Sequence, residues 1–280
     1  MSEEKSPTAL KHILVALDAS PHSRAALDAA VKVAAAFEAE VHGLFVEDEA
    51  LLRTAQLPFA HEVRAYTTPP KQLSNRRVQR QMRYQSEYAE HTLQYAAEEA
   101  EVAYDFETVQ GSVTRELLRA TAETDLLVLG KTSTQSSRRR LGSTSQAVLA
   151  EATAPVLVVR EVIPVQQPIL TYYDGSDASN DALRMAVQLA RKGGSRPLTV
   201  LLPARAEAEA TRLREEVENR CGADVPLSVH ALTPAESRRL SAVARRSGGL
   251  VVLPADCAPL DHVPLKQFLY EIDRPLLIVR

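Results

Sequence analysis

Two glycines on either side of a hydroxyl-rich, basic loop are the residues of this chain best suited to hold phosphate. Gly130 follows the apolar run Leu126–Leu129, and Gly142 is followed directly by Ser143 and Thr144. A glycine lets a ligand approach the backbone closely, and the free N–H groups at the start of a helix favour an anion. The spacing therefore indicates a phosphate cradle between a strand and a helix.

The same loop also has plainer interpretations. Ser143 and Gln146 fit a capping box, in which a serine and a glutamine three positions later satisfy the first N–H groups of a helix. The run Arg138–Arg140 is typical of a solvated face. The loop sequence alone does not decide between a phosphate cradle and a helix cap.

Asp18 is the second candidate for chemistry. It ends the apolar run Ile13–Leu17 and precedes Ser20 and Pro21, which predict the start of a helix. Its carboxylate could accept from an adenine amino group or a ribose hydroxyl, or it could cap the turn. In an open parallel sheet, ligands bind beyond the carboxyl ends of the strands where the strand order reverses. We expect Asp18 and Gly130 to meet there, with Val46 beside a base.

The elements that must position these residues alternate along the first half. Helices are predicted after Ser20, over about 74–100 and over about 144–151. This rhythm predicts a parallel sheet with right-handed crossovers, which is the α/β class. The predicted strands are Ile13–Leu17, Val41–Val46, Ala103–Val109, Asp125–Gly130 and Pro155–Val159.

The second half repeats the first. Placing Asp174 under Asp18 aligns both opening strands and helices, and Pro275–Arg280 then matches Pro155–Arg160. A repeat of this length predicts two copies of one fold. We expect two tandem doubly wound domains, each with a five-stranded parallel sheet and helices on both faces, over residues 1–162 and 168–280.

The second copy lacks the features of the phosphate loop. Pro254 stands where the first copy has Gly130, and the loop Ala255–Pro264 contains Asp256 and Asp261 but no Gly-Ser pair. Acidic side chains repel phosphate, and prolines remove backbone donors. The second copy is expected to be a structural partner, with the binding of an unrelated ligand as the alternative.

Segment 47–75 has no counterpart in the second copy and contains Pro58, Pro69 and Pro70 together with several apolar residues. It is expected to be either a lid over a site at the strand ends or a flap that packs one half against the other. Its apolar content favours the flap.

Composition narrows the class of protein. The chain has 280 residues, 45% of them apolar, and a formal charge of -3, so no global basic field predicts a nucleic-acid partner. No apolar run reaches the roughly 18 residues that span a bilayer, and the polar start Met1–Pro7 does not resemble a secretory signal. We expect a cytoplasmic protein without membrane insertion. Cys221 and Cys257 are expected to be free, inert thiols.

These residues resemble the universal stress protein family in its tandem, two-domain form. Ile13–Ser20 is similar to the opening strand and aspartate of that family, and Asp125–Gly130 and Ala154–Val159 are similar to its closing strands. The resemblance implies the strand order 3-2-1-4-5 in each half. It also implies an intramolecular pseudo-dimer through Val156–Val159 and Leu276–Val279, and it leaves a further homodimer open.

The resemblance also implies a ligand, which is ATP or ADP with or without Mg. ATP-binding members carry a glycine, two residues, a second glycine, nine residues, and then a glycine with Ser or Thr. Gly130 matches the first glycine, Ser133 stands in place of the second, and Gly142 follows a loop one residue shorter than the pattern. The implied binding residues are Ala16, Asp18, Ser20, Val46, Leu129, Gly130, Thr132, Ser133, Gly142, Ser143 and Thr144.

The function expected from these features is an adenine-nucleotide-binding stress or regulatory protein with an unidentified protein partner and at most slow ATP hydrolysis. The full phosphate-loop signature of the ATPases is absent from the sequence. The alternative is a nucleotide-independent adaptor or scaffold that recruits a partner through segment 47–75, with Ser133 and the shortened loop in its favour. A ligase-type adenylating enzyme of the same broad topology is a third hypothesis.

Overall fold

The computed structural model describes residues 10–57, 61–64, 67–72, 74–130, 143–159, 167–203, 206–237, 240–247, 249–256, 268, 271–272 and 274–280. Residues 10–159 are called the first half below, and residues 167–280 the second half.

The first half forms a five-stranded parallel sheet in the order β5-β2-β1-β6-β7. In chain order this is third, second, first, fourth, fifth, as predicted. Its helix α4 was not foreseen. The elements are β1 (His12–Leu17), α1 (Pro21–Phe37), β2 (Glu40–Asp48), α3 (Asn75–Glu99), β5 (Tyr104–Gly111), α4 (Val113–Ala120), η1 (Thr121–Glu123), β6 (Leu126–Gly130), α5 (Ser143–Glu151) and β7 (Val156–Val159).

The second half repeats this order as β10-β9-β8-β11-β12, again with parallel neighbours. The register is repeated too, because Ile13 pairs with Leu126 and the aligned Ile169 pairs with Leu250. The predicted repeat and fold class are confirmed. The elements are β8 (Ile169–Tyr172), α6 (Asp177–Lys192), β9 (Leu198–Leu202), α7 (Glu207–Cys221), β10 (Leu227–Ala231), α8 (Pro234–Ser237), α9 (Leu240–Ser247), β11 (Leu250–Pro254) and β12 (Leu276–Val279).

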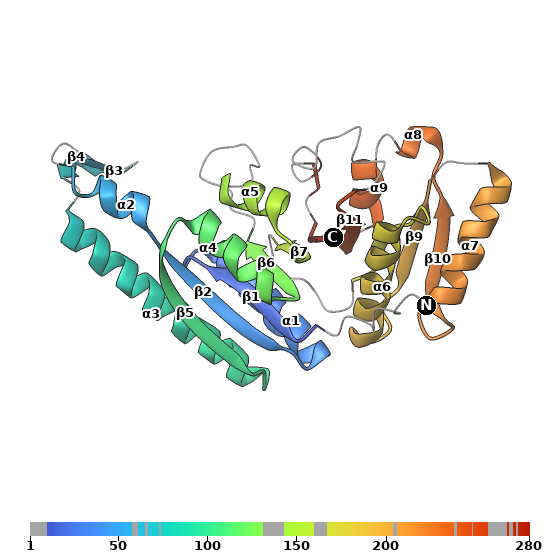
Figure 1. Ribbon diagram of the computed structural model, residues 1–280, viewed down its shortest axis with the longest axis horizontal. Coiled ribbons are helices and arrows are strands. Elements are labelled where there is room, and N and C mark those ends of the chain that lie inside the picture. Colours follow the sequence, from blue (N-terminus) through green and yellow to red (C-terminus); the bar gives the residue numbers. More distant parts are fainter. Residues whose placement is uncertain are drawn as a thin grey trace.

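The fifth strands of the two halves, β7 and β12, pair with each other in antiparallel orientation. Leu157 lies opposite Leu277 and Val156 lies opposite Ile278. Each strand covers an apolar edge that would otherwise expose unpaired backbone groups. The pairing produces one ten-stranded sheet across the molecule (Figure 1).

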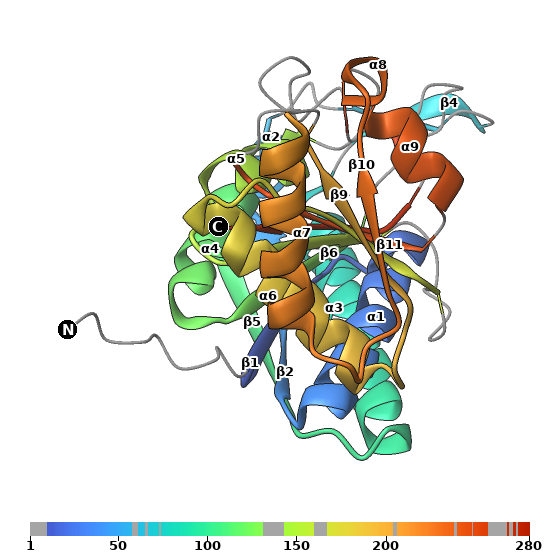
Figure 2. The ribbon, with the colours of Figure 1, turned by 90° about the vertical axis from the view of Figure 1, so that its right-hand side faces the viewer.

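Helices cover both faces of this sheet. In the first half, α1 and α3 lie on one side and α4 and α5 on the other (Figure 2). Each face has one apolar cluster, and each cluster contains buried residues of both halves: Leu27 and Leu183 belong to one, and Leu149 and Ile278 to the other. The two halves therefore share their cores.

Segment 47–75 forms α2 (Glu49–Thr54) and a two-stranded hairpin of β3 (His61–Arg64) and β4 (Thr67–Gln72). Leu52 and Ala55 pack against Val78 and Met82 of α3 in a small separate cluster. The segment lies at the end of the molecule far from the second half (Figure 1). The prediction that the segment packs one half against the other is therefore wrong for the described residues, since Leu52 and Ala55 pack α2 onto α3. The lid stays a prediction.

The structure bears on two further expectations, which concern the cysteines and membrane insertion. Cys221 is a free, buried thiol whose pKa is raised by burial to about 11, so it is an inert residue at neutral pH. Cys257 lies outside the described residues. Within the part of the chain that the structure describes, no helix is both long and apolar enough to cross a membrane.

Because both apolar clusters run across the β7–β12 junction, we predict that the two halves unfold together. Urea denaturation followed by far-UV circular dichroism and by tyrosine fluorescence should give one coincident transition. Leu157→Ala, at a buried position of β7, should lower the free energy of unfolding by about 2–5 kcal/mol and shift both signals equally. Two separated transitions would contradict the shared core.

Candidate nucleotide site

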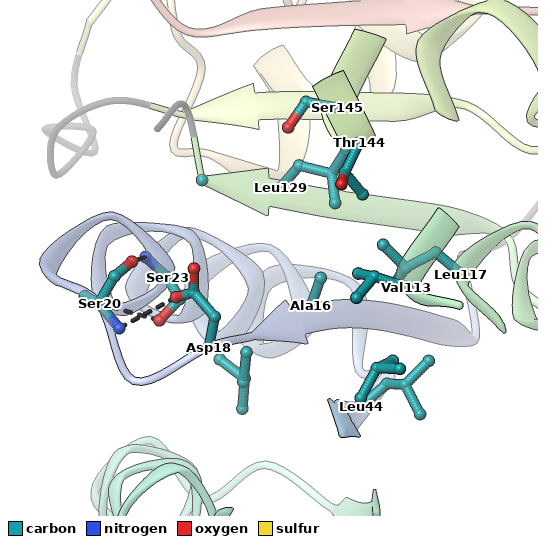
Figure 3. Close-up of a pocket in the computed structure, with 13 residues that line it drawn as sticks. Ala16, Asp18, Ser20, Ser23, Leu44, Val113, Leu117, Leu129, Thr144 and Ser145 are labelled. Carbon is teal, nitrogen blue, oxygen red and sulfur yellow. Dashed lines mark hydrogen bonds between the residues drawn. The ribbon is translucent and has the colours of Figure 1, made fainter. Parts of the chain in front are cut away.

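A cavity of about 230 Å³ lies at the carboxyl ends of β1, β2 and β6 (Figure 3). β1 lies between β2 and β6, so this is the point where the strand order reverses. The cavity is lined by Ala16, Leu17, Asp18, Ser20, Ser23, Leu44, Val46, Val113, Leu117, Leu129, Gly130, Thr144 and Ser145.

Much of the predicted set lies in this lining, namely Ala16, Asp18, Ser20, Val46, Leu129, Gly130 and Thr144. Thr132, Ser133 and Gly142 lie outside the described residues, and Ser143 begins α5 with its side chain outside them. Whether any of these residues binds a nucleotide stays a prediction.

Sequence reasoning missed other lining residues, and simple signals could have found some of them. Leu44 is two positions before Val46 on β2, so both side chains point to the same face. Val113 and Leu117 have the four-residue spacing of one helix face, but α4 is a short helix that was not predicted. Ser23 is one helical turn beyond the cap Ser20.

Asp18 is held in a turn between β1 and α1. Its Oδ1 accepts a hydrogen bond from the Ser20 N–H at 3.0 Å. Ser20 caps α1 by accepting from the Ser23 N–H at 3.2 Å, and Ser23 Oγ donates to the Ser20 carbonyl at 3.0 Å. Ala19, at the tip, has φ 57, a left-handed conformation that is strained for alanine. The turn fixes the direction of an exposed carboxylate beside the cavity.

Gly130 is required by the close approach of α1 to the end of β6. A Cβ atom at this position would lie 2.5 Å from the backbone oxygen of His22 and 3.0 Å from the backbone nitrogen of Ser23. The sequence suggested a sharp turn or a ligand close to the backbone. The described contact is with the first turn of α1, and it brings the end of β6 against the Asp18 turn. The approach of a ligand to this backbone stays a prediction.

Comparisons with known proteins identify the group to which this fold and site belong. Residues 9–160 match the model of the universal stress protein family. The chain belongs to that family. No curated protein sequence matches the chain.

Solved structures extend the likeness over both halves. A universal stress protein from Archaeoglobus fulgidus DSM 4304 has a TM-score of 0.73 and 16% identity, covering 96% of this chain and 98% of that one. A functionally unknown protein from Pseudomonas aeruginosa PAO1 has a TM-score of 0.62 and 14% identity, covering 98% and 93%. At these identities the likeness shows the fold alone.

Within this universal stress protein fold, the cavity has three chemically different walls (Figure 3). Asp18, Ser20 and Ser23 form a polar wall, and apolar side chains such as Leu44 and Leu117 face it across the cavity. Thr144 and Ser145 bring the hydroxyl-bearing first turn of α5 to the third wall. Such a site combines an apolar wall, a hydrogen-bond acceptor, and a helix N-terminus that favours an anion.

The second half retains the turn without the rest of this arrangement. Asp174 Oδ1 accepts from the Ser176 N–H at 3.0 Å, and Ser176 accepts from the Ser179 N–H at 3.2 Å, as in the first half. Pro254, however, occupies the register position of Gly130, because it pairs with Val279 as Gly130 pairs with Val159. The Asp-Ser turn is thus common to both halves, whereas the glycine that ends the fourth strand is present only in the first half.

Tyr173 also distinguishes the second half, because it follows β8 where Leu17 ends β1. Its side chain is 0% exposed, and its hydroxyl lies 2.9 Å from Glu216 Oε2 and 3.1 Å from Asn180 Oδ1. Burial and the hydrogen bond with Glu216 raise the pKa of Tyr173 from its usual 10.0 to about 12. A bulky neutral phenol therefore joins β8 to α6 and α7.

We predict that Gly130→Ala lowers the free energy of unfolding by about 1–3 kcal/mol, because the new methyl group must displace the backbone of α1. Pro254→Ala is the matched control, since that position already accommodates a side chain, and it should change stability by less than ~1 kcal/mol. Urea denaturation of the two variants measures both effects. Equal losses would contradict the steric role of Gly130.

Tyr173 predicts a specific alkaline instability. Because its pKa is higher in the folded state, the folded protein is favoured by the neutral phenol below pH 10.0, and ionisation lowers the free energy of unfolding by at most ~2–3 kcal/mol as the pH rises towards about 12. Tyr173→Phe should cost about 1 kcal/mol at pH 8 through lost hydrogen bonds. It should also flatten the fall in unfolding free energy above pH 10.0. Parallel pH profiles for the two proteins would show that Tyr173 does not carry this effect.

Proposed function

We propose that this protein is a stress-response or regulatory protein that binds an adenine nucleotide, ATP or ADP with or without Mg, in the first-half cavity. One observation carries the proposal: the fixed carboxylate of Asp18, an apolar slot and the first turn of α5 surround one cavity where the strand order reverses. The three walls suit the sugar, the base and the phosphates of a nucleotide.

The proposed roles follow from these walls. Asp18 accepts from adenosine hydroxyl or amino groups, since a carboxylate has further acceptor capacity beyond its bond to the Ser20 N–H. Val46, together with Leu44, flanks the base. The phosphates extend towards Gly130 and Thr144, and the proposal assigns them the further contacts Thr132, Ser133, Gly142 and Ser143.

The size of the cavity limits what it encloses. At about 230 Å³ it lies below the ~300–1,000 Å³ of most small-molecule pockets. It therefore suits the base and ribose, with the charged phosphates outside it near the start of α5. This division agrees with its polar and apolar walls.

The second half is proposed to act as the structural partner of the first, with the domains at 1–162 and 168–280. A direct contact supports a link between them: the Arg280 guanidinium donates to the Leu149 carbonyl of α5. Since α5 begins at the candidate phosphate wall, a ligand there contacts the helix that the second half holds. Occupancy would thereby alter the contact between the halves or the surface shown to another protein.

An adaptor without nucleotide is the second candidate function. Its support is a group of large exposed side chains on segment 47–75 and α3: Leu51 and Leu57 are each 43% exposed, and Tyr84 is 65% exposed. Exposed apolar side chains such as these could contact a partner if they form one contiguous patch. In this function, Leu51→Lys weakens partner capture while Asp18→Ala does not.

The test compares the same turn in the two halves. Asp18→Ala and Asp174→Ala each remove an aspartate that accepts from a serine N–H at 3.0 Å, and Asp174 also accepts from Ser176 Oγ at 2.6 Å, so Asp174→Ala should cost at least as much stability as Asp18→Ala. Only Asp18→Ala should weaken ATP binding, by about 10- to 100-fold, because it alone removes a charged acceptor from the cavity. Isothermal titration with ATP and Mg measures both variants against the wild type.

Mass spectrometry of small molecules released from the denatured wild-type protein identifies a retained nucleotide. Equal ATP affinities for Asp18→Ala and wild type would reject the assigned site. A wild-type protein that retains no nucleotide and gains no thermal stability from ATP or ADP would favour the adaptor.

A further inference from the structure

A second and larger cavity, of about 510 Å³, lies across the junction of the two halves on the face covered by α1 and α6. Its walls are mostly apolar. Val33 and Ala36 of α1 face Leu189 of α6, and Leu157 of β7 and Leu277 of β12 form the floor between them. Its volume falls within the ~300–1,000 Å³ range of small-molecule sites.

The charge around this apolar cavity has one sign. Lys32, Lys192 and Arg196 line it, and the described lining includes no acidic side chain. Arg196 is only 8% exposed, and burial lowers its pKa. A buried guanidinium without a carboxylate is energetically unfavourable. The described lining of the cavity supplies no anion to Arg196.

One guanidinium nitrogen of Arg196 lacks a hydrogen-bond partner within the described residues. Its Nε donates to the Gln167 carbonyl at 2.6 Å, while its Nη2 is buried and has no hydrogen-bond partner within the described residues. Buried polar atoms without partners are uncommon in folded proteins. A guanidinium suits the geometry of a carboxylate or a phosphate, and the mostly apolar walls favour the carboxylate of an apolar chain because it carries the smaller charge.

Arg196 is also held in place. Its backbone N–H donates to the Ala190 carbonyl at 3.0 Å, beyond the end of α6. Its side chain lies over Gly193, where an added Cβ would come within 2.5 Å of Arg196 Cδ. The chain therefore fixes the cation at the margin of the apolar cavity.

We propose that this cavity binds a long-chain carboxylate, such as a fatty acid. The hydrocarbon chain lies between α1 and α6 over the β7–β12 junction, and the carboxylate contacts Arg196. The proposal is independent of nucleotide binding, because the two cavities share no lining residue. Such a ligand contacts both halves and stabilises their association.

The test uses the full-length, delipidated protein and isothermal titration with laurate below its critical micelle concentration. Laurate should bind with 1:1 stoichiometry. Dodecanol, with the same chain and no charge, should bind at least tenfold more weakly, and dodecylammonium should bind more weakly still. Equal binding of laurate and dodecanol, or no laurate binding, would overturn the proposal.

Two variants locate the site. Arg196→Met should weaken laurate binding at least tenfold, whereas Arg184→Met should leave it unchanged. Arg184 is a partly exposed arginine of α6 that pairs with Asp181 at 2.9 Å and does not line this cavity. Unchanged laurate affinity in Arg196→Met would reject its role.

If Arg196→Met fails to fold, Ala36→Phe provides the second variant. Ala36 is partly exposed and lines the cavity, so the larger side chain should fill the space and abolish laurate binding while the protein keeps its native circular dichroism spectrum. Full laurate affinity in a folded Ala36→Phe protein would place the binding elsewhere and overturn the proposal.

Discussion

The backbone hydrogen bonds between β7 and β12 hold the molecule in its observed form. Without them each half would present a short, fully apolar edge strand to water, since Val156–Val159 and Leu276–Val279 are buried on both faces. The pairing also makes both apolar clusters continuous between the halves. The contact between Arg280 and α5 and the apolar cavity beside Arg196 depend on this junction.

Much of this architecture was predictable because its signals are local and repeated. The strands are short apolar runs, the cap of α1 is a Ser-Pro pair, and the two copies align residue by residue. The helix α4 was missed because a helix of 8 residues owes its stability to packing rather than to its own sequence. The packing of α2 on α3 was missed for a related reason, since apolar side chains in a segment do not tell which surface they will cover.

The candidate site, too, was predictable from the sequence only in part. Asp18, Val46 and Gly130 were predicted to lie together from the general position of ligands in parallel sheets, and they line one cavity. The reason for Gly130 could not be predicted. The 2.5 Å distance between an added Cβ atom and the His22 backbone oxygen depends on how α1 packs against β6. The second half adds a caution: its Asp174 turn keeps the same hydrogen bonds, so an aspartate after the first strand does not by itself identify a ligand site.

The covalent link between the halves has a consequence for symmetry. In a homodimer of identical subunits, every substitution appears twice, so a change that removes one site removes both. In this single chain, Gly130 and Pro254 occupy equivalent places and differ, as do Leu17 and Tyr173. One copy is thereby free to lose the features of a binding site and serve as scaffold, while the other retains them. The single chain is asymmetric where a homodimer would be symmetric.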